Sequence, residues 1–429
     1  MKTRTLALTL FALAACGSSQ PSRTIPAPPA TVNSAESAPA VVEKVPVGPD
    51  LNRRLPLDPL IRRTVLENGL TVYVMPHKKP EQRAQLWLAV NAGSVLEDDD
   101  QQGLAHFVEH MCFNGTKRFA KQAIVDFIEK VGMRFGADVN AYTSFDQTVY
   151  MLTVPTDDQK TMLTGLDILR DWSHDVSFDQ AEVDKERGVV TEEWRLGRDA
   201  WTRIWDKERP VMFAGSRYAQ RSPIGLPEIL KSAPRDALVR FYKDWYQPQN
   251  MAVIAVGDFD PDQMQKEIEA RFGDLAATQN AKVRTPVAVP HDQPTSVTVV
   301  QDKEMPYSKV SIMQKMDHRP EHRWSDHRRI TVEDLYHTMV RSRLSEIAQD
   351  PDAPFMWAGS SSGALARTAD SFDRFAVAKE GRTADALTLL VKEVRRIEQF
   401  GFTQTELDRA KADFLSNADS SAKEWDKAP

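Results

Sequence analysis

The chain is poor in cysteine, because its 429 residues contain only Cys16 and Cys112. Two thiols cannot build a disulfide scaffold or a cysteine-based zinc site, so both classes are excluded. The chain also lacks an excess of positive charge: 55 lysines and arginines stand against 61 acidic residues, which gives a formal net charge of −6. This balance predicts no nucleic-acid partner.

Long apolar runs are also missing. The longest candidate, residues 6–15, is about half as long as the ~20 residues that a membrane span needs. It follows Lys2 and Arg4 and ends in LAAC at residues 13–16, as in a secretory signal. The LAAC sequence resembles a bacterial lipobox, so residues 1–16 are expected to be a lipoprotein signal peptide with lipidation at Cys16. A plain secretory signal with an incidental cysteine is the alternative.

Residues 17–52 are rich in Pro, Ala, Ser and Val and show neither helical nor strand periodicity. Such a segment cannot bury enough apolar surface to fold, so we expect a disordered linker. Gly17 follows the cysteine, which resembles outer-membrane lipoproteins. The expected location is the bacterial periplasm, with an outer-membrane lipid anchor through Cys16.

The rest of the chain alternates strand-like and helix-like segments and predicts an α+β fold. Asn68-Gly69 separates two β-rich runs and predicts a hairpin over residues 62–75. No glycine-rich phosphate loop follows any predicted strand, which argues against a parallel nucleotide-binding sheet. Further strands are expected at 85–91, 140–143, 148–154 and 251–256, and helices at 103–113, 121–131, 157–174, 179–196 and 261–272.

One internal repeat is visible. The sequence FDQAEVDKER at 178–187 matches FTQTELDRAK at 402–411, which lies 224 positions later. The shared Phe, Gln, Glu and Asp predict two copies of one domain type.

We expect a first domain over 53–278 and a second over 290–429. A polar linker joins them, and the second is expected to begin with a strand at 296–300. Residues 416–429 form a polar stretch in which no closing strand or helix pair is expected, so the second copy stops short.

The motif that carries chemistry is His-Phe-Val-Glu-His at residues 106–110. At about 100° per residue, His106, Glu109 and His110 share one helix face and the apolar residues share the other. Histidines at i and i+4 can reach one Zn²⁺, and the carboxylate can accept a proton from metal-bound water. This order is the inverzincin signature. An amphipathic helix with a solvated polar face is the alternative.

A catalytic zinc takes three protein ligands and keeps a fourth position open. The helix expected at 179–196 carries Glu186 and Glu193 seven positions apart, within about 20° of one another around its axis. One can bind the metal while the other orients a ligand or the substrate amine. On these residues alone, a solvated acidic helix remains the alternative.

Taken together, GLAHFVEHM at 103–111, FNGT at 113–116, NAYT at 140–143 and ERGVVTEEW at 186–194 resemble the insulinase/pitrilysin family of zinc peptidases. The similarity is greatest to its long bacterial members. The resemblance implies tandem α/β sandwich domains of the insulinase/mitochondrial processing peptidase type, of which only the first binds metal. In the repeat, Ala410 and Asn417 stand where Glu186 and Glu193 stand in the first copy.

The resemblance also implies roles for the residues of the motif. His106, His110 and Glu193 would bind one Zn²⁺ per chain. Glu109 would be the general base, and Glu186 an accessory acid.

Asn140, Ala141 and Tyr142 match the family's substrate-binding edge strand, to which a peptide substrate adds as an extra strand. An internal strand is the alternative. The expected function is a zinc metalloendopeptidase of extended peptides. Family members close two such halves around the substrate, so a second-half subunit or self-association is the expected partner. The competing hypothesis is a non-catalytic or partner-dependent peptide-binding half of a two-part peptidase.

Overall fold

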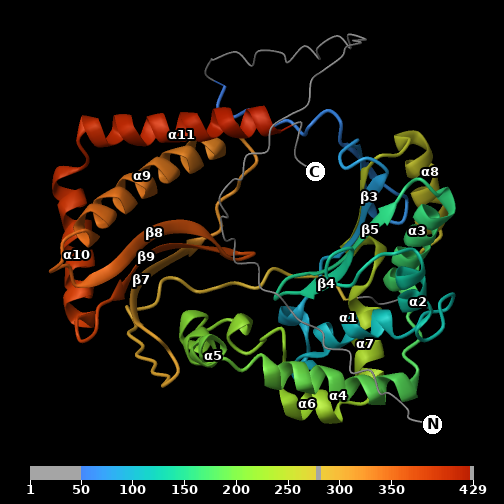
Figure 1. Ribbon diagram of the computed structural model, residues 1–429. Helices are drawn as coiled ribbons and strands as arrows, with labels where there is room; N and C mark the ends of the chain where they lie inside the picture. The colour runs from blue at the N-terminus through green and yellow to red at the C-terminus, as the bar shows by residue number, and fades with distance from the viewer. Residues whose placement is uncertain (1–49, 277–281, 426–429) are drawn as a thin grey trace, which may run out of the picture.

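The computed structural model describes residues 50–276 and 282–425. The predicted signal peptide, Cys16 and most of the predicted linker lie outside the described residues. The described chain forms two α/β units, each a sheet with helices packed against it (Figure 1). No helix within these ranges combines the length and the apolar character needed to cross a bilayer.

The first unit contains a six-stranded sheet with the order β1-β2-β6-β3-β5-β4. β2 and β6 pair in parallel, and the other pairs of neighbouring strands are antiparallel. β3 lies inside the sheet, and its alternate residues, from Ala84 to Val90, are buried against the helices. The strands are β1 (Arg62–Val65), β2 (Thr71–Pro76), β3 (Arg83–Val90), β4 (Val139–Thr143), β5 (Thr148–Pro155) and β6 (Met251–Gly257).

Eight α-helices belong to the first unit. Trp172, Phe107 and Phe241 are among the large side chains that are fully buried in its core. The helices are α1 (Leu104–Phe113), α2 (Ala123–Lys130), α3 (Gln159–His174), α4 (Gln180–Leu196), α5 (Ala200–Met212), α6 (Pro227–Ser232), α7 (Arg235–Trp245) and α8 (Pro261–Phe272). Every strand and helix that the sequence predicts between residues 62 and 272 is present in the structure, with ends shifted by about two residues at most.

The second unit contains a three-stranded antiparallel sheet with the order β7-β9-β8. Its strands are β7 (Ser308–Asp317), β8 (Phe355–Ala366) and β9 (Ala369–Ala378). Its helices are α9 (Trp324–Ala348), α10 (Thr383–Phe400) and α11 (Gln404–Glu424), which lie together on the outer side of the curved sheet in Figure 1.

The strand register confirms the duplication that the sequence predicts. Leu88 on β3 pairs with Tyr150 on β5, and Ile312 on β7 pairs with Arg374 on β9. Both members of the second pair lie 224 positions after their counterparts, which is the offset of the sequence repeat. α3 and α10 begin at the same offset, and so do α4 and α11. The two units are therefore copies of one domain type.

The predicted strand at 296–300 is wrong. These residues form no β-ladder, and Val297 and Val299 are 86% and 82% exposed. The first domain gives the physical reason. Its corresponding strand, β2, pairs with β6 and β1 rather than with β3. The described part of the second domain has no strand equivalent to β6, so the apolar alternation at 296–300 finds no partner.

The predicted polar stretch after residue 415 continues the helix α11 as far as Glu424. A capping box between Thr403 and Glu406 starts this helix. Ala410 is its one buried residue, Leu407 and Phe414 are half-buried, and residues 416–424 are all exposed. The polar composition at 416–424 is therefore that of a solvent-exposed helix end.

Candidate metal centre

The helix α1 carries the His-Phe-Val-Glu-His motif and is anchored by its apolar face. Leu104, Phe107, Val108, Met111 and Cys112 are fully buried in the core of the first domain. This packing turns the opposite face, which bears the two histidines and the glutamate, toward α4 and β4. The helix follows Gly103, whose φ of +100° favours glycine.

Glu97 fixes the start of α1. Its Oε1 accepts hydrogen bonds from the backbone N–H groups of Gly103 (3.0 Å) and Ala105 (2.8 Å). The side chain is fully buried, and its Oε2 has no hydrogen-bond partner in the described structure. Burial raises the pKa of Glu97 to about 8, although the two backbone bonds and Arg221 and Arg217 oppose the rise. Sequence reasoning missed this residue, which lies in a loop outside the motif.

The helix α4 brings two glutamates to the histidines. Asp179 caps its first turn, and Val183 and Val190 are buried against the core. Glu193 Oε2 lies 3.2 Å from His110 Nε2, and Glu193 Oε1 lies 3.7 Å from His106 Nε2. On the other side of the same ring, His110 Nδ1 lies 2.8 Å from Glu186 Oε1.

These distances separate the roles of the two glutamates. Glu193 faces the Nε2 atoms of both histidines, whereas Glu186 holds the far nitrogen of one ring. A carboxylate that accepts the remaining N–H of a metal-binding histidine orients that ring toward the ion. His106 Nδ1, by contrast, is buried without a hydrogen-bond partner among the described residues.

His106, His110 and Glu193 fit a zinc ion. Their ligand atoms lie within 4.8 Å of one another, and no other part of the described chain gathers three such groups. Tetrahedral zinc with bonds of 2.0–2.1 Å places its ligand atoms about 3.3 Å apart. The separations of 3.2 and 3.7 Å are close to this value. Two imidazoles and one carboxylate are also a common donor set of catalytic zinc.

The charges of the group favour a cation. Burial and the neighbouring His110 lower the pKa of His106 to about 4, so this ring is neutral. Burial opposes the charged form of His110, but hydrogen bonds to Glu186 and Glu193 outweigh it and raise the pKa to about 10. Burial would likewise raise the pKa of Glu193, yet His110 and His106 lower it. The carboxyl groups of Glu186 and Glu193 thus both lie beside one positive charge, that of His110. A divalent cation would balance this acidic group better.

Glu109 lies on the same helix face and does not belong to the ligand group. It is only 7% exposed, and the Thr143 hydroxyl donates to its Oε2 at 2.6 Å. Burial is the main cause that raises the pKa of Glu109 to about 7. Thr143 was not predicted as a site residue, although it is the last residue of the NAYT motif.

The strand that bears Asn140, Ala141 and Tyr142 is the outer strand of its sheet. β4 pairs with β5 on one side, and on the other the described structure has no strand, only an isolated bridge between Phe135 and Val139 at the start of β4. Among the described residues β4 is therefore an edge strand and not an internal one. Tyr142 is 42% exposed, and its hydroxyl accepts a hydrogen bond from Gln147 Nε2 (2.8 Å). The free edge of β4 and the buried Glu109 are joined through Thr143.

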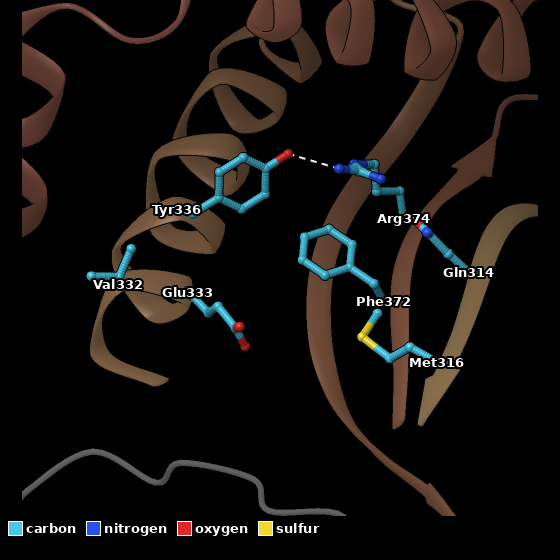
Figure 2. Close-up of a pocket in the computed structure, with 7 residues that line it drawn as sticks. All are labelled: Gln314, Met316, Val332, Glu333, Tyr336, Phe372 and Arg374. Carbon is cyan, nitrogen blue, oxygen red and sulfur yellow. Dashed lines mark hydrogen bonds between the residues drawn. The ribbon is translucent and has the colours of Figure 1, made fainter. Parts of the chain in front are cut away.

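The second domain has a polar contact at the same place as one in the first domain. Cys112 contacts the Tyr150 hydroxyl in the first domain, and at the same offset Arg374 donates to the Tyr336 hydroxyl (2.7 Å; Figure 2). Tyr336 and Arg374 line an apolar groove of about 400 Å³. The first-domain residues at the corresponding positions are buried, where α7 packs against α1 and β6 pairs with β3.

The second domain has no counterpart of the metal ligands. Ile330 and Asp334 stand at the positions of His106 and His110, and Ala410 and Asn417 at those of Glu186 and Glu193. Glu333, at the position of Glu109, lies 3.4 Å from the Ser362 hydroxyl. The duplicated helix therefore keeps an acid–hydroxyl contact without a site for a metal.

Two family models match the chain. Residues 72–209 match the insulinase peptidase family, M16, and residues 232–414 match the M16 peptidase inactive domain. The chain therefore belongs to the insulinase (M16) peptidase family, which confirms the resemblance read from its motifs.

Its relatives include the probable zinc protease PqqL of Escherichia coli (strain K12), which is 34% identical over 84% of this chain and 39% of the relative. The crystal structure of the periplasmic protease PqqL from Escherichia coli superposes with a TM-score of 0.82 at 32% identity, covering 88% of this chain and 42% of that one. The structure of its first half gives a TM-score of 0.79 at the same identity, covering 88% and 81%. The chain thus spans about two fifths of the length of full-length PqqL.

A pH prediction follows from Glu97. Folding raises its pKa from 4.5 to about 8, so between these values the folded chain holds a proton that the unfolded chain releases. The free energy of unfolding should fall as the pH rises through this window, by a few kcal/mol in order of magnitude. Glu97→Gln cannot ionise and should flatten this slope, as measured by urea unfolding at pH 5, 6, 7 and 8.

Glu67→Gln, at an exposed position in the β1–β2 turn, is the matched control and should retain the wild-type slope. An unchanged slope in Glu97→Gln would show that the buried carboxyl does not carry this proton.

Proposed function

We propose that the chain is a zinc metalloendopeptidase that hydrolyses extended peptides. The observation that carries the proposal is the convergence of His106, His110 and Glu193 beside a buried Glu109. Membership of the insulinase family supports the reaction class. Similarity to a probable zinc protease supports the metal.

In this proposal each residue near the site has one task. His106, His110 and Glu193 would hold the zinc, and Glu186 orients the His110 ring through its Nδ1. Zinc in such a site supplies an activated water and stabilises the oxyanion that develops on the scissile carbonyl. Glu109 takes the proton of the attacking water and delivers it to the leaving amine.

The substrate is proposed to bind along β4. An extended peptide can pair with the free edge of this strand through main-chain hydrogen bonds, which depend little on side-chain identity. The peptide would then lie beside Asn140, Ala141 and Tyr142. The next residue of β4, Thr143, is hydrogen-bonded to Glu109. This arrangement selects an unfolded or extended segment rather than a particular side chain.

The proposed location is the periplasm, with a lipid anchor at Cys16. The proposed zinc-binding domain covers residues 53–278, and the proposed metal-free domain covers residues 290–429. The LAAC sequence and the periplasmic relative support this location. Because the chain spans about two fifths of full-length PqqL, a second-half subunit or self-association is the proposed partner. The second candidate function is a peptide-binding half that cleaves only with such a partner.

The Glu109→Gln variant tests the proposed base. It should retain about one zinc per chain, because Glu109 is not a ligand, and lose cleavage by about 10²–10⁴-fold, the usual contribution of a general base. Zinc is measured by mass spectrometry of the purified chain, and cleavage with a quenched unstructured peptide.

The wild-type outcome separates the two candidate functions. Zinc together with cleavage that Glu109→Gln abolishes supports the endopeptidase. Zinc without cleavage in the wild type supports the partner-dependent half. Equal cleavage in both chains would contradict the assigned role of Glu109.

The two glutamates of α4 should differ in their effect on zinc. Glu193→Gln removes a proposed ligand and should abolish stoichiometric binding. Glu186→Gln removes only the partner of His110 and should weaken affinity by about 10–100-fold. Competition with a chromophoric chelator measures both.

Glu192→Gln is the matched control, because Glu192 is the neighbour of Glu193 on α4 but pairs with Arg195 at the surface. Its zinc affinity should equal that of the wild type. Equal loss in Glu192→Gln and Glu193→Gln would contradict the ligand assignment.

A further inference from the structure

The turn between β4 and β5, residues 144–147, is held by groups from several separate segments. The backbone N–H of Ser94 donates to Ser144 O (3.1 Å), and that of Val95 donates to Phe145 O (2.9 Å). The Tyr218 hydroxyl donates to the Asp146 carboxylate at 2.8 Å. This turn is therefore an anchored element rather than a loose hairpin loop.

Two arginines also contact the turn, at Asp146. Arg284, from the segment between the domains, donates to Asp146 Oδ1 (2.7 Å), to Asp146 O (2.8 Å) and to Asn91 O (2.7 Å). Arg367 Nε lies 3.7 Å from Asp146 Oδ1, and its Nη1 donates to Asn91 Oδ1. Both guanidinium groups thus meet the same carboxylate and the same asparagine.

Arg367 differs from the other groups because it comes from the second domain, in the short connection between β8 and β9. The tip of this hairpin enters the first domain: Ala369 is fully buried in the core of the first domain, and Leu365 and Ala366 pack against it. The neighbouring Thr368 hydroxyl also donates to Val287 O (2.5 Å). The hairpin tip is therefore a fixed point of contact between the domains.

The turn that Arg367 reaches carries the elements of the proposed reaction. Thr143 directly precedes the turn and donates to Glu109, and the free edge of β4 precedes Thr143. A shift of the turn would move the hydroxyl that holds Glu109 together with the strand that would receive the peptide. Displacements of about 1 Å at such groups can cost a reaction 10²-fold.

We propose that Arg367 is a positioning residue, through which the metal-free second domain fixes the β4–β5 hairpin for catalysis. The Asp146 side chain is 16% exposed and that of Arg284 is 11% exposed, whereas Arg367, at 39%, forms the solvent side of the cluster. Charge-assisted hydrogen bonds in such surroundings are strong, and the loss of one donor leaves its acceptors less well satisfied. The catalytic part of this inference rests on the proposed function, whereas the positioning part does not.

Hydrogen exchange of the full-length chain tests the positioning directly. In Arg367→Met, the amides of residues 140–148 should exchange about tenfold faster, because the turn loses the Arg367–Asp146 ion pair and the hydrogen bond to Asp146 O. Amides of β3 and α4 should be unaffected. Arg367→Lys keeps the charge and one donor direction, so it should recover part of the protection.

Arg382→Met is the matched control. Arg382 lies in the same domain, is 45% exposed against 39% for Arg367, and pairs with a single aspartate, Asp385. None of its described contacts reaches the first domain, so Arg382→Met should leave exchange and cleavage unchanged. If the wild-type chain cleaves peptides, Arg367→Met should lower kcat/KM about tenfold with zinc content unchanged.

Unchanged exchange at residues 140–148 in Arg367→Met would overturn the proposal, as would an equal acceleration in Arg382→Met. A rise in exchange over the whole first domain would also overturn it, because that result indicates general destabilisation. A wild-type chain that cleaves no peptide would contradict the proposed function alone, since the exchange comparison does not depend on activity.

Discussion

The crossing of α1 and α4 is the contact on which the candidate site depends. The His110 ring contacts a carboxylate at each nitrogen, Glu186 at Nδ1 and Glu193 at Nε2. Neither helix contains the site alone, because one supplies the imidazoles and the other the carboxylates. The apolar face of α1 and the buried valines of α4 hold the crossing in place, so core packing sets the geometry at which a metal would bind.

The two copies of the domain differ in what they bring to the candidate site. The second domain repeats the strand register and the acid–hydroxyl contact of the first, with Glu333 and Ser362 in place of Glu109 and Thr143. It lacks the three proposed metal ligands and also the Glu186 that holds the far nitrogen of His110. What it contributes instead is a hairpin tip that enters the first domain's core and places Arg367 Nε 3.7 Å from the Asp146 carboxylate in the β4–β5 turn. A domain without metal ligands can therefore still contact the structure around the candidate site.

Local patterns predicted much of this structure. The 3.6-residue period places His106, Glu109 and His110 on one face and pairs Glu186 with Glu193, and the structure brings these residues together. What the sequence could not show is non-local. The apolar alternation at 296–300 indicated a strand, but a strand forms only beside a partner. Glu97 and Thr143 contact α1 from outside its His-Phe-Val-Glu-His motif, and Asp146 is contacted by residues far away in the chain.

Zinc K-edge X-ray absorption of the purified, zinc-loaded chain tests the central claim most directly, because it reads the ligand atoms themselves. The account predicts about one zinc per chain with only nitrogen and oxygen neighbours near 2.0–2.2 Å, including two imidazoles. The imidazole signal should disappear when His106 and His110 are both replaced by alanine. Sulfur scattering near 2.3 Å, or an imidazole signal that survives the double substitution, would contradict a metal centre at the crossing of α1 and α4.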